Sequence, residues 1–233
     1  MKSLINNLVV KISSFLPDKA LSSSKAEWNK LAGENHRYYI VSKKGKQIDE
    51  ETFRKTGEEN YKELISSDSL LKEHLGSFSD KKVLDIGCGA GRLTEFFSKE
   101  FAHATGVDIS EQMVAEATKR LEHIPNVTFV ANDGQNHPFP DNNFDLVFSY
   151  IVFQHMPSRD VVLQNFKEVK RILKPTGIAK IQIRGGNKVL KGSWFYGPSF
   201  TKEEAETLAK ESGLQIVKMG DDSVKRFFLW LKK

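Results

Sequence analysis

The residues best suited to chemistry lie in one short segment, where a carboxylate is followed by three alternating glycines. Val83 to Arg92 reads V-L-D-I-G-C-G-A-G-R, with Asp85 at the end of an apolar run and glycines at Gly87, Gly89 and Gly91. Glycine has no Cβ, so a chain can turn sharply there and a ligand can approach the backbone closely. Leu93, Phe96 and Phe97 indicate a helix directly afterwards, whose free N–H groups point at the loop. The segment predicts a strand, a ligand-binding loop and a helix.

The details of this loop favour a cationic nucleotide over a dinucleotide. A dinucleotide fingerprint has the spacing G-x-G-x-x-G, whereas the glycines here run G-x-G-x-G and Arg92 follows. The carboxylate of Asp85 would repel a pyrophosphate and attract an ammonium group. Both features argue against a nicotinamide-dependent reductase, and they predict a ligand that carries positive charge beside Asp85.

Two more acids follow apolar strands. The predicted strand Ala104–Val107 ends in Asp108, whose carboxylate can accept hydrogen bonds from both hydroxyls of a ribose. The alternative is that Asp108 caps the next helix, although Ser110 suits that position better. The predicted strand Val127–Val130 leads into Asn132, Asp133 and Gly134, which places another acid near an adenine amino group, unless Asp133 is only a turn residue. We expect the three acids to surround one adenosyl group.

In their order and spacing, these segments resemble the motifs of the class I S-adenosylmethionine-dependent methyltransferases. V-L-D-I-G-C-G-A-G-R is similar to that family's first motif, T-G-V-D-I-S to its second and A-N-D-G to its third, while F-D-L-V-F-S and R-I-L-K-P-T-G resemble its fourth strand and the approach to its fifth. The resemblance covers about two-thirds of the chain and implies S-adenosylmethionine as cofactor. The residues expected to bind it are Asp85, Gly87, Cys88, Gly89, Gly91, Arg92, Asp108, Ile109, Asn132, Asp133, Gly134, Ser149 and Tyr150.

Methyl transfer from a sulfonium needs alignment of the reacting atoms, and a neutral hydroxyl acceptor also needs a base. His155 is the best-placed candidate, because it follows the fourth strand at the edge where open α/β sheets bind ligands. The alternative is a structural or substrate-side role for Gln154 and His155. His137 is expected to be solvated. The sequence S-Y-I-V-F-Q-H-M-P after that strand lacks the acids of a metal-assisted enzyme and the clamp typical of base amino-methylation.

Acceptor specificity is expected to come from two aromatic regions outside the shared motifs. One lies before residue 79 and includes Trp28, Tyr38 and Tyr39 in an arrangement similar to the cap of some bacterial small-molecule methyltransferases; the other is the glycine-rich stretch 185–200. Aromatic side chains on loops suggest a cover over an apolar or planar molecule. The alternative is that those before residue 79 only pack the N-terminal region against the catalytic domain. The candidate acceptor-binding residues are Tyr38, Tyr39, Gln154, His155, Trp194 and Tyr196.

From Lys82 onward, predicted strands alternate with helices, which indicates an α/β fold with a doubly wound, mostly parallel sheet. The resemblance implies seven strands, the last antiparallel. Thr201 and Glu204 predict a capping box for a helix over Lys202–Ser212, with Gly213 after it. We expect an N-terminal helical cap over residues 1–78 and the methyltransferase domain over residues 79–233. Pro17 is predicted to end a first helix, and Leu21–Lys25 to form a connector. A later helix is predicted over Glu58–Leu75, with Gly76 after it.

Composition agrees with a soluble globular enzyme. The chain has 233 residues, of which 39% are hydrophobic and 28% charged, and its single cysteine, Cys88, excludes an internal disulfide and favours the cytoplasm. The net charge of +5 is not gathered into a basic aromatic patch, so nucleic-acid binding is not expected, and no metal site is expected because only one cysteine and scattered histidines are present. The sequence contains no run of about 20 apolar residues, which is the length that a membrane-spanning helix needs.

The first sixteen residues repeat apolar side chains at helical spacing, which predicts an amphipathic helix. In order of preference it would cover the catalytic domain, pair with a second subunit or lie on a membrane surface; the oligomeric state is open. The sequence thus predicts a methyltransferase that acts on a small molecule by in-line displacement. Action on a protein or RNA, or a non-catalytic adenosyl-binding module, are the alternatives.

Overall fold

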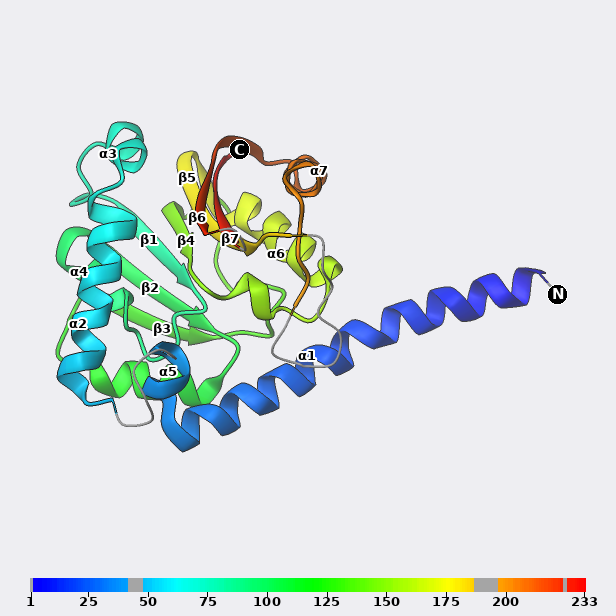
Figure 1. Cartoon of the computed structure of the whole chain (residues 1–233), viewed down its shortest axis with the longest axis horizontal. Coiled ribbons are helices and arrows are strands. Elements are labelled where there is room, and N and C mark those ends of the chain that lie inside the picture. Colours follow the sequence, from blue (N-terminus) through cyan, green and yellow to red (C-terminus); the bar gives the residue numbers. More distant parts are fainter. Residues whose placement is uncertain (1, 42–47, 187–196, 224–225) are drawn as a thin grey trace.

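A twisted sheet of seven strands forms the centre of the molecule, with helices on both faces (Figure 1). The computed structural model describes residues 2–41, 48–186, 197–223 and 226–233, the side chains of residues 2–19 and 221–223 excepted. The strands are β1 (Lys82–Ile86), β2 (His103–Asp108), β3 (Val127–Ala131), β4 (Phe144–Ser149), β5 (Leu173–Arg184), β6 (Gln215–Ser223) and β7 (Arg226–Lys232). The helices are α1 (Lys2–Val41), α2 (Glu50–Tyr61), α3 (Ser69–Leu75), α4 (Thr94–Glu100), α5 (Glu111–Arg120), α6 (Arg159–Ile172) and α7 (Lys202–Ser212), with a π-helical turn η1 (Lys62–Ser66) and a 3-10 turn η2 (Phe153–His155).

The strand order is β3-β2-β1-β4-β5-β7-β6. Strands β1 to β5 pair in parallel, whereas β7 pairs antiparallel with both β5 and β6. The order reverses between β1 and β4, which makes their carboxyl ends the switch point where open α/β sheets bind ligands. The doubly wound, mostly parallel seven-stranded sheet expected from the sequence is confirmed.

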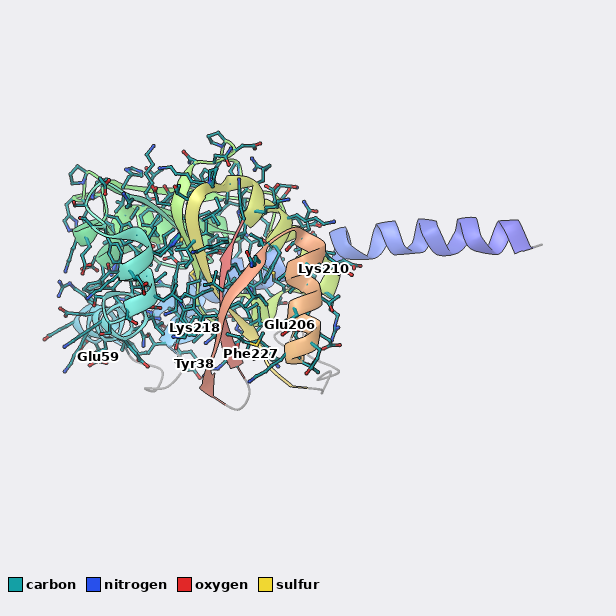
Figure 2. The ribbon with its side chains drawn as sticks, turned by 90° about the horizontal axis from the view of Figure 1, so that it is seen from above. Tyr38, Glu59, Glu206, Lys210, Lys218 and Phe227 are labelled. Atoms are coloured by element: carbon teal, nitrogen blue, oxygen red, sulfur yellow. The ribbon has the colours of Figure 1, made fainter. Side chains whose placement is uncertain are left out.

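Alternating side chains divide the core into two layers. On β1, Leu84 and Ile86 pack in one layer with residues of α6 and α7, while Val83 packs in the other with residues of α2, η1, α3 and α4. Both layers are buried because parallel strands need cover on both faces. Figure 2 shows α7, marked by Glu206 and Lys210, beside the strands that carry Lys218 and Phe227. The predicted capping box of α7 forms, and Gly213 ends the helix in the left-handed conformation.

The N-terminal part differs from the prediction. The backbone stays helical from Lys2 to Val41, with a kink at Asn35 (φ −171°, ψ 79°), so Pro17 does not end a helix and Leu21–Lys25 is no connector. Proline removes one hydrogen bond of a helix and its ring crowds the carbonyl four residues earlier, which destabilises the helix locally. Leu21 and Ser24 are buried, and their contacts with the body favour a continuous helix over an exposed linker. The first half of α1 extends away from the body (Figure 1), so the part that covers the site is its second half, not residues 1–16.

A second difference lies in the segment predicted as one helix over Glu58–Leu75. The structure ends α2 at Tyr61, adds a π-helical turn and starts α3 afresh at Ser69. The Asp68 side chain accepts hydrogen bonds from the backbone N–H groups of Leu70 (3.0 Å) and Leu71 (3.1 Å), which satisfies the start of a new helix. Gly76 follows α3 with positive φ, as predicted.

Candidate cofactor and acceptor site

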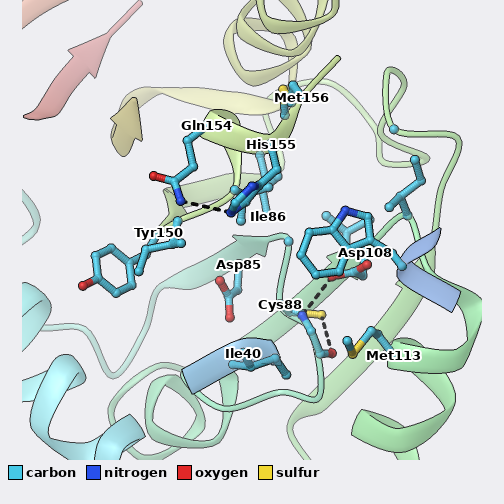
Figure 3. Close-up of a pocket in the computed structure, with 18 of the residues that line it drawn as sticks. Ile40, Asp85, Ile86, Cys88, Asp108, Met113, Tyr150, Gln154, His155 and Met156 are labelled. Atoms are coloured by element: carbon cyan, nitrogen blue, oxygen red, sulfur yellow. Dashed lines mark hydrogen bonds between the residues drawn. The ribbon is translucent and has the colours of Figure 1, made fainter. Parts of the chain in front are cut away.

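The loops at the carboxyl ends of β1, β2, β3 and β4 surround a cavity of about 370 Å³, and α1 contributes one wall (Figure 3). That volume is in the range of small-molecule sites. From the predicted cofactor set, the cavity is lined by Asp85, Gly87, Cys88, Gly89, Arg92, Asp108, Ile109, Asn132, Gly134 and Tyr150. The sequence therefore identifies most of the residues that form the wall at the ends of β1, β2 and β3.

The glycine loop is shaped by its close contacts. Gly87 has φ +72°, and a Cβ there would lie 2.2 Å from a methyl carbon of Val152, which belongs to the loop after β4. Gly89 has φ +53°, and its Cβ would lie 2.9 Å from the Cδ1 of Ile40 on α1. Any larger residue would force these segments apart. The loop thus brings α1 and the loop after β4 to the same point.

Asp108 forms part of the loop structure as well as the cavity wall. One oxygen accepts from the backbone N–H of Gly89 and the other from that of Ser110, both at 2.9 Å. Ser110 is the N-cap of α5, as expected from the sequence, because its hydroxyl accepts from the N–H of Met113. Each carboxylate oxygen keeps a lone pair for a ribose hydroxyl. The surrounding protein raises the pKa of Asp108 above its usual value because it disfavours the charged form.

Asp85 is the more deeply placed acid, with 4% of its surface exposed. The hydroxyl of Thr94 donates to its Oδ2 at 2.7 Å. Burial raises the pKa of Asp85 to about 7. Figure 3 shows the carboxylates of Asp85 and Asp108 on either side of Cys88. This floor suits a ligand that brings a cation to Asp85 and hydroxyl groups to Asp108.

Three residues of the predicted cofactor set do not line the cavity. Gly91 packs against Leu121 and Phe129, and the hydroxyl of Ser149 donates to the carbonyl of Ile86 at 3.0 Å, which ties β4 to β1. Asp133 is exposed, and its carboxylate accepts from the N–H groups of Gln135 and Asn136 within its own turn. Its role at the adenine stays a prediction.

His137 is buried, not solvated as the sequence suggested. Its ring lines the cavity, only 2% of the residue is exposed, and burial lowers the pKa of the imidazole to about 4. The Nδ2 of Asn132 lies 3.3 Å from His137 Nδ1. The backbone around the histidine is fixed too, because its N–H donates to Glu168 and its carbonyl accepts from Arg171. The prediction was wrong because the proline that follows, Pro138, suggested an exposed loop.

The acceptor side of the cavity lies beyond β4. Gln154 and His155 come from η2, and the amide nitrogen of Gln154 lies 3.0 Å from His155 Nε2. Because an amide nitrogen only donates, His155 Nε2 accepts this bond and the imidazole proton resides on Nδ1. His155 also meets the ring of Trp28 edge to face, with centroids 5.6 Å apart. A base role would require Gln154 to release this nitrogen.

Some of the aromatic residues predicted for the site line the cavity in the structure, and others do not. Tyr39 and Tyr150 line the cavity, and Tyr150 stacks on Phe228 at 5.9 Å. Tyr38 does not line it and packs against Tyr39 instead. Trp194 and Tyr196 lie outside the residues that the structure describes.

Several lining residues were not predicted. Leu21, Ser24, Ile40, Met113, Asn165 and Arg226 carry no motif, and only the fold brings them together. Ile151 lines the cavity with φ +60°, a conformation that a β-branched residue rarely adopts. Its N–H donates to Gln182 Oε1 at 3.1 Å, which helps to hold the turn. Such strain collects at functional sites and has no signature in the sequence.

A parallel sheet with a glycine loop after β1 and an acid after β2 at the switch point defines a nucleotide-binding α/β protein. Comparisons with known proteins show which proteins of this class the chain resembles. Residues 83–177 match a family model described as a methyltransferase domain. The chain is 35% identical over 126 residues to a sterol 24-C-methyltransferase of Gibberella zeae, covering 52% of this chain and 32% of that protein. It is 37% identical over 97 residues to the 2-methyl-6-phytyl-1,4-hydroquinone methyltransferase of Synechocystis, covering 41% and 30%.

Among solved structures, magnesium protoporphyrin IX methyltransferase from Synechocystis with bound S-adenosylhomocysteine superimposes with a TM-score of 0.66 at 17% identity, over 91% of this chain and 99% of that one. A methyltransferase from Aquifex aeolicus gives a TM-score of 0.58 at 23% identity, over 79% and 98%. Residues 83–177 thus form a methyltransferase domain, and the comparisons support the class I S-adenosylmethionine-dependent methyltransferase family, with S-adenosylmethionine as its cofactor. The chain spans about a third of the length of the two relatives named above.

Within the described residues, no helix has the length and apolarity needed to cross a bilayer. The same residues contain no group of three or more histidine, cysteine or acidic side chains arranged for a metal ion.

Proposed function

We propose that this chain binds S-adenosylmethionine and transfers its methyl group to a small-molecule acceptor by in-line displacement. The observation that carries the proposal is that one cavity contains both the acids expected to hold the cofactor and a second set of aromatic and polar groups from α1 and from the turn η2 after β4. A methyl group placed between the two sets would be within reach of an acceptor. The second half of α1 covers this space, which favours a small molecule over a protein or RNA chain.

The cofactor side has the charges that the ligand needs. In this proposal Asp85 pairs with the ammonium group of the methionine part and Asp108 accepts hydrogen bonds from the ribose hydroxyls. The cofactor supplies the activated methyl group. The chain's own residues align the reactants and exclude water, which accounts for much of the rate in such reactions.

The acceptor side favours an apolar ring compound. Of the residues that line the cavity, we assign Trp28, Tyr39 and Met156 to this side, with Gln154 and Arg226 as its polar groups. The names of the relatives, which refer to a sterol and a hydroquinone, agree with an acceptor of this kind. His155 is the candidate base for a hydroxyl acceptor, with its Nε2 freed from Gln154 when the acceptor binds.

The proposed organisation is a cap over residues 1–78 and a methyltransferase domain over residues 79–233. Contacts across this boundary support a cooperative unit: Asn29 on α1 accepts from the hydroxyl of Ser110 at 2.7 Å, and Arg54 on α2 pairs with Glu95 on α4 at 2.7 Å. We propose a cytoplasmic location, which rests on the use of a single cysteine, Cys88.

Calorimetry and a transfer assay test the proposal. We expect S-adenosylhomocysteine to bind with micromolar affinity while NADH does not bind. With methyl-labelled S-adenosylmethionine, we expect label in the small-molecule or lipid fraction of an extract and none in separate tRNA and protein fractions. Absence of S-adenosylhomocysteine binding would refute the cofactor assignment. Binding without transfer to any fraction would instead identify a non-catalytic adenosyl-binding module.

A further inference from the structure

Two arginines face each other across β5 and β7 where these strands reach the cavity. Arg184 and Arg226 are direct partners in the antiparallel register of the two strands. Directly opposed side chains lie on the same face of a sheet with Cβ atoms about 5 Å apart, and like charges in such a pair repel each other. Both arginines are partly buried, and Arg226 lines the cavity. A negatively charged group bound there would relieve the repulsion.

Next to the arginine pair, the same face of β7 is aromatic. Phe228 follows Arg226 by two positions and therefore points to the same face of the sheet. Its ring stacks on that of Tyr150 with centroids 5.9 Å apart, and Tyr150 lines the cavity. The wall of the cavity near β7 thus combines an aromatic ring with a guanidinium group. This combination suits a molecule that has an apolar body and a negatively charged group.

The order of the strands places Arg226 away from the acids that we assign to the cofactor. Strands β4 and β5 separate β7 from β1, which carries Asp85. Because neighbouring strands lie about 4.8 Å apart, β7 and β1 are separated by roughly 14 Å. Asp108 is one strand further away, on β2, and Figure 3 shows Tyr150 and Asp108 on opposite sides of Asp85. Arg226 therefore belongs to the side of the cavity assigned to the acceptor.

Arg184 connects the arginine pair to the turn that carries Gln154 and His155. Its Nη2 donates to the carbonyl oxygen of Gln154 at 3.5 Å, and the N–H of Gly197 donates to the same oxygen at 2.7 Å. The side-chain amide of Gln154 in turn contacts the imidazole of His155 at 3.0 Å. An anion held by the arginines would therefore lie close to the groups that we expect to contact the acceptor.

We propose that the acceptor carries an anionic group, a carboxylate or a phosphate monoester, that Arg226 binds, and that Arg184 is a second cation which strengthens this binding. Arginine pairs with both kinds of anion through two parallel hydrogen bonds. The anion anchors the acceptor and is not the atom that receives the methyl group, because the guanidinium occupies the lone pairs that a nucleophile needs. The proposal rests on the proposed function and narrows its apolar acceptor to one that is also an acid.

A transfer assay with separated acceptors tests the charge of the acceptor. An extract of lipids and metabolites is divided on an anion exchanger at pH 8 into a neutral and an acidic fraction, and each is incubated with methyl-labelled S-adenosylmethionine and the wild-type protein. We expect label in a compound of the acidic fraction, and we expect the exchanger to retain the product, since its anion is not methylated. Phosphatase treatment of the acidic fraction beforehand abolishes the transfer if the anion is a phosphate monoester and preserves it if the anion is a carboxylate.

Variants of the arginine pair test which residues bind the anion. Arg226→Met should raise the amount of acidic fraction that gives the half-maximal rate by roughly 10- to 100-fold, the range for hydrogen bonds between charged groups, with S-adenosylhomocysteine affinity within about 2-fold of the wild type. Arg226→Lys keeps the charge and should recover part of this loss. Arg184→Met should raise the same amount by roughly 3-fold, because Arg184 acts from beside the cavity. This second variant also serves if Arg226→Met fails to fold.

Lys218→Met is the matched control. It removes an exposed cation from the same face of the sheet, where Nζ of Lys218 lies 4.8 Å from the centre of the Trp230 ring, outside the cavity. The half-maximal amount of acidic fraction should equal that of the wild type in this variant. A general loss of positive charge from this face would instead affect Lys218→Met and Arg184→Met equally, and it would overturn the assignment of the arginine pair.

Transfer from the neutral fraction that equals or exceeds transfer from the acidic fraction would overturn the proposal, and this comparison needs only the wild-type protein. An unchanged half-maximal amount in both Arg226→Met and Arg184→Met would do the same. Weaker S-adenosylhomocysteine binding in Arg226→Met would assign this arginine to the cofactor and refute its role at the acceptor. Absence of transfer from both fractions is a different result, since it would refute the proposed function itself.

Discussion

The raised pKa of Asp85 predicts that cofactor affinity depends on pH in the neutral range. Burial raises the pKa of its carboxyl group to about 7, although the hydrogen bond from Thr94 favours the ionised form. Only the ionised form attracts the ammonium of the ligand, so a bound ligand lowers the pKa of Asp85. Affinity must therefore be weaker below pH 7 and reach its full value above it.

The size of the effect follows from a pKa of about 7 for Asp85. At pH 6 about one tenth of Asp85 is ionised, and at pH 8 about nine tenths. The affinity for S-adenosylhomocysteine should rise roughly tenfold between these values, or about 1.4 kcal/mol. At pH 6 binding should release close to one proton. The pKa of His137, about 4, lies below this window and does not contribute.

Calorimetry at pH 6, 7 and 8, in two buffers of different ionisation enthalpy, measures affinity and proton release together. 5′-Methylthioadenosine is the control ligand, because it lacks the ammonium but keeps the ribose that we assign to Asp108. Asp85→Asn is the control protein and should show weak binding of S-adenosylhomocysteine without the rise. The reasoning fails if wild-type affinity stays constant from pH 6 to 8, or if Asp85→Asn keeps the same slope.

Three further changes test other parts of the site and the fold. Asp108→Ala should weaken S-adenosylhomocysteine by about 1.5–3 kcal/mol in calorimetry, since it removes a charged acceptor; unchanged affinity would remove Asp108 from the ribose role. His155→Gln should lower kcat by about 10²- to 10⁴-fold with a hydroxyl acceptor, at unchanged S-adenosylhomocysteine affinity; full activity would rule out a base role. Lys180→Met should cost about 3–5 kcal/mol in urea unfolding, because Lys180, 4% exposed, pairs with the buried Asp68 at 2.7 Å. A loss under about 1 kcal/mol would show that Asp68 finds another partner.

The sheet could be predicted because its signals are local. Short apolar runs that end in glycine or an acid mark β1, β2 and β3, and the capping residues Thr201 and Glu204 mark the start of α7. Each of these signals depends on neighbours within four residues, which is the range that patterning reasoning can see.

The failures depend on contacts between distant residues. Asp68 interrupts the predicted long helix because it is held by Lys180 and by the indole N–H of Trp230 at 2.8 Å, more than a hundred positions away. Leu21 is buried against the body, and the helix continues past Pro17. Neither contact can be predicted from the pattern of neighbouring residues.

The site was predictable on the cofactor side and less so on the acceptor side. Motifs identified Asp85 and Asp108, whose roles in binding stay predictions. Arg226 and Ile151 reach the cavity only because β7 and the turn after β4 fold toward it. The same limit applies to His137, whose burial depends on α6, where Glu168 accepts from its backbone N–H.

Helix α1 touches the loops after three different strands, through Ile40 at Gly89, Leu21 at Gly134 and Trp28 at His155. A nucleoside that fills the cavity would meet the helix and these loops together, so its affinity and the docking of α1 are thermodynamically linked. The coupling is reciprocal: the free energy by which the docked helix strengthens binding of the nucleoside equals the free energy by which a bound nucleoside stabilises the docked helix. A shortened chain that starts at α2 would therefore hold the nucleoside more weakly while keeping every acid of the motifs.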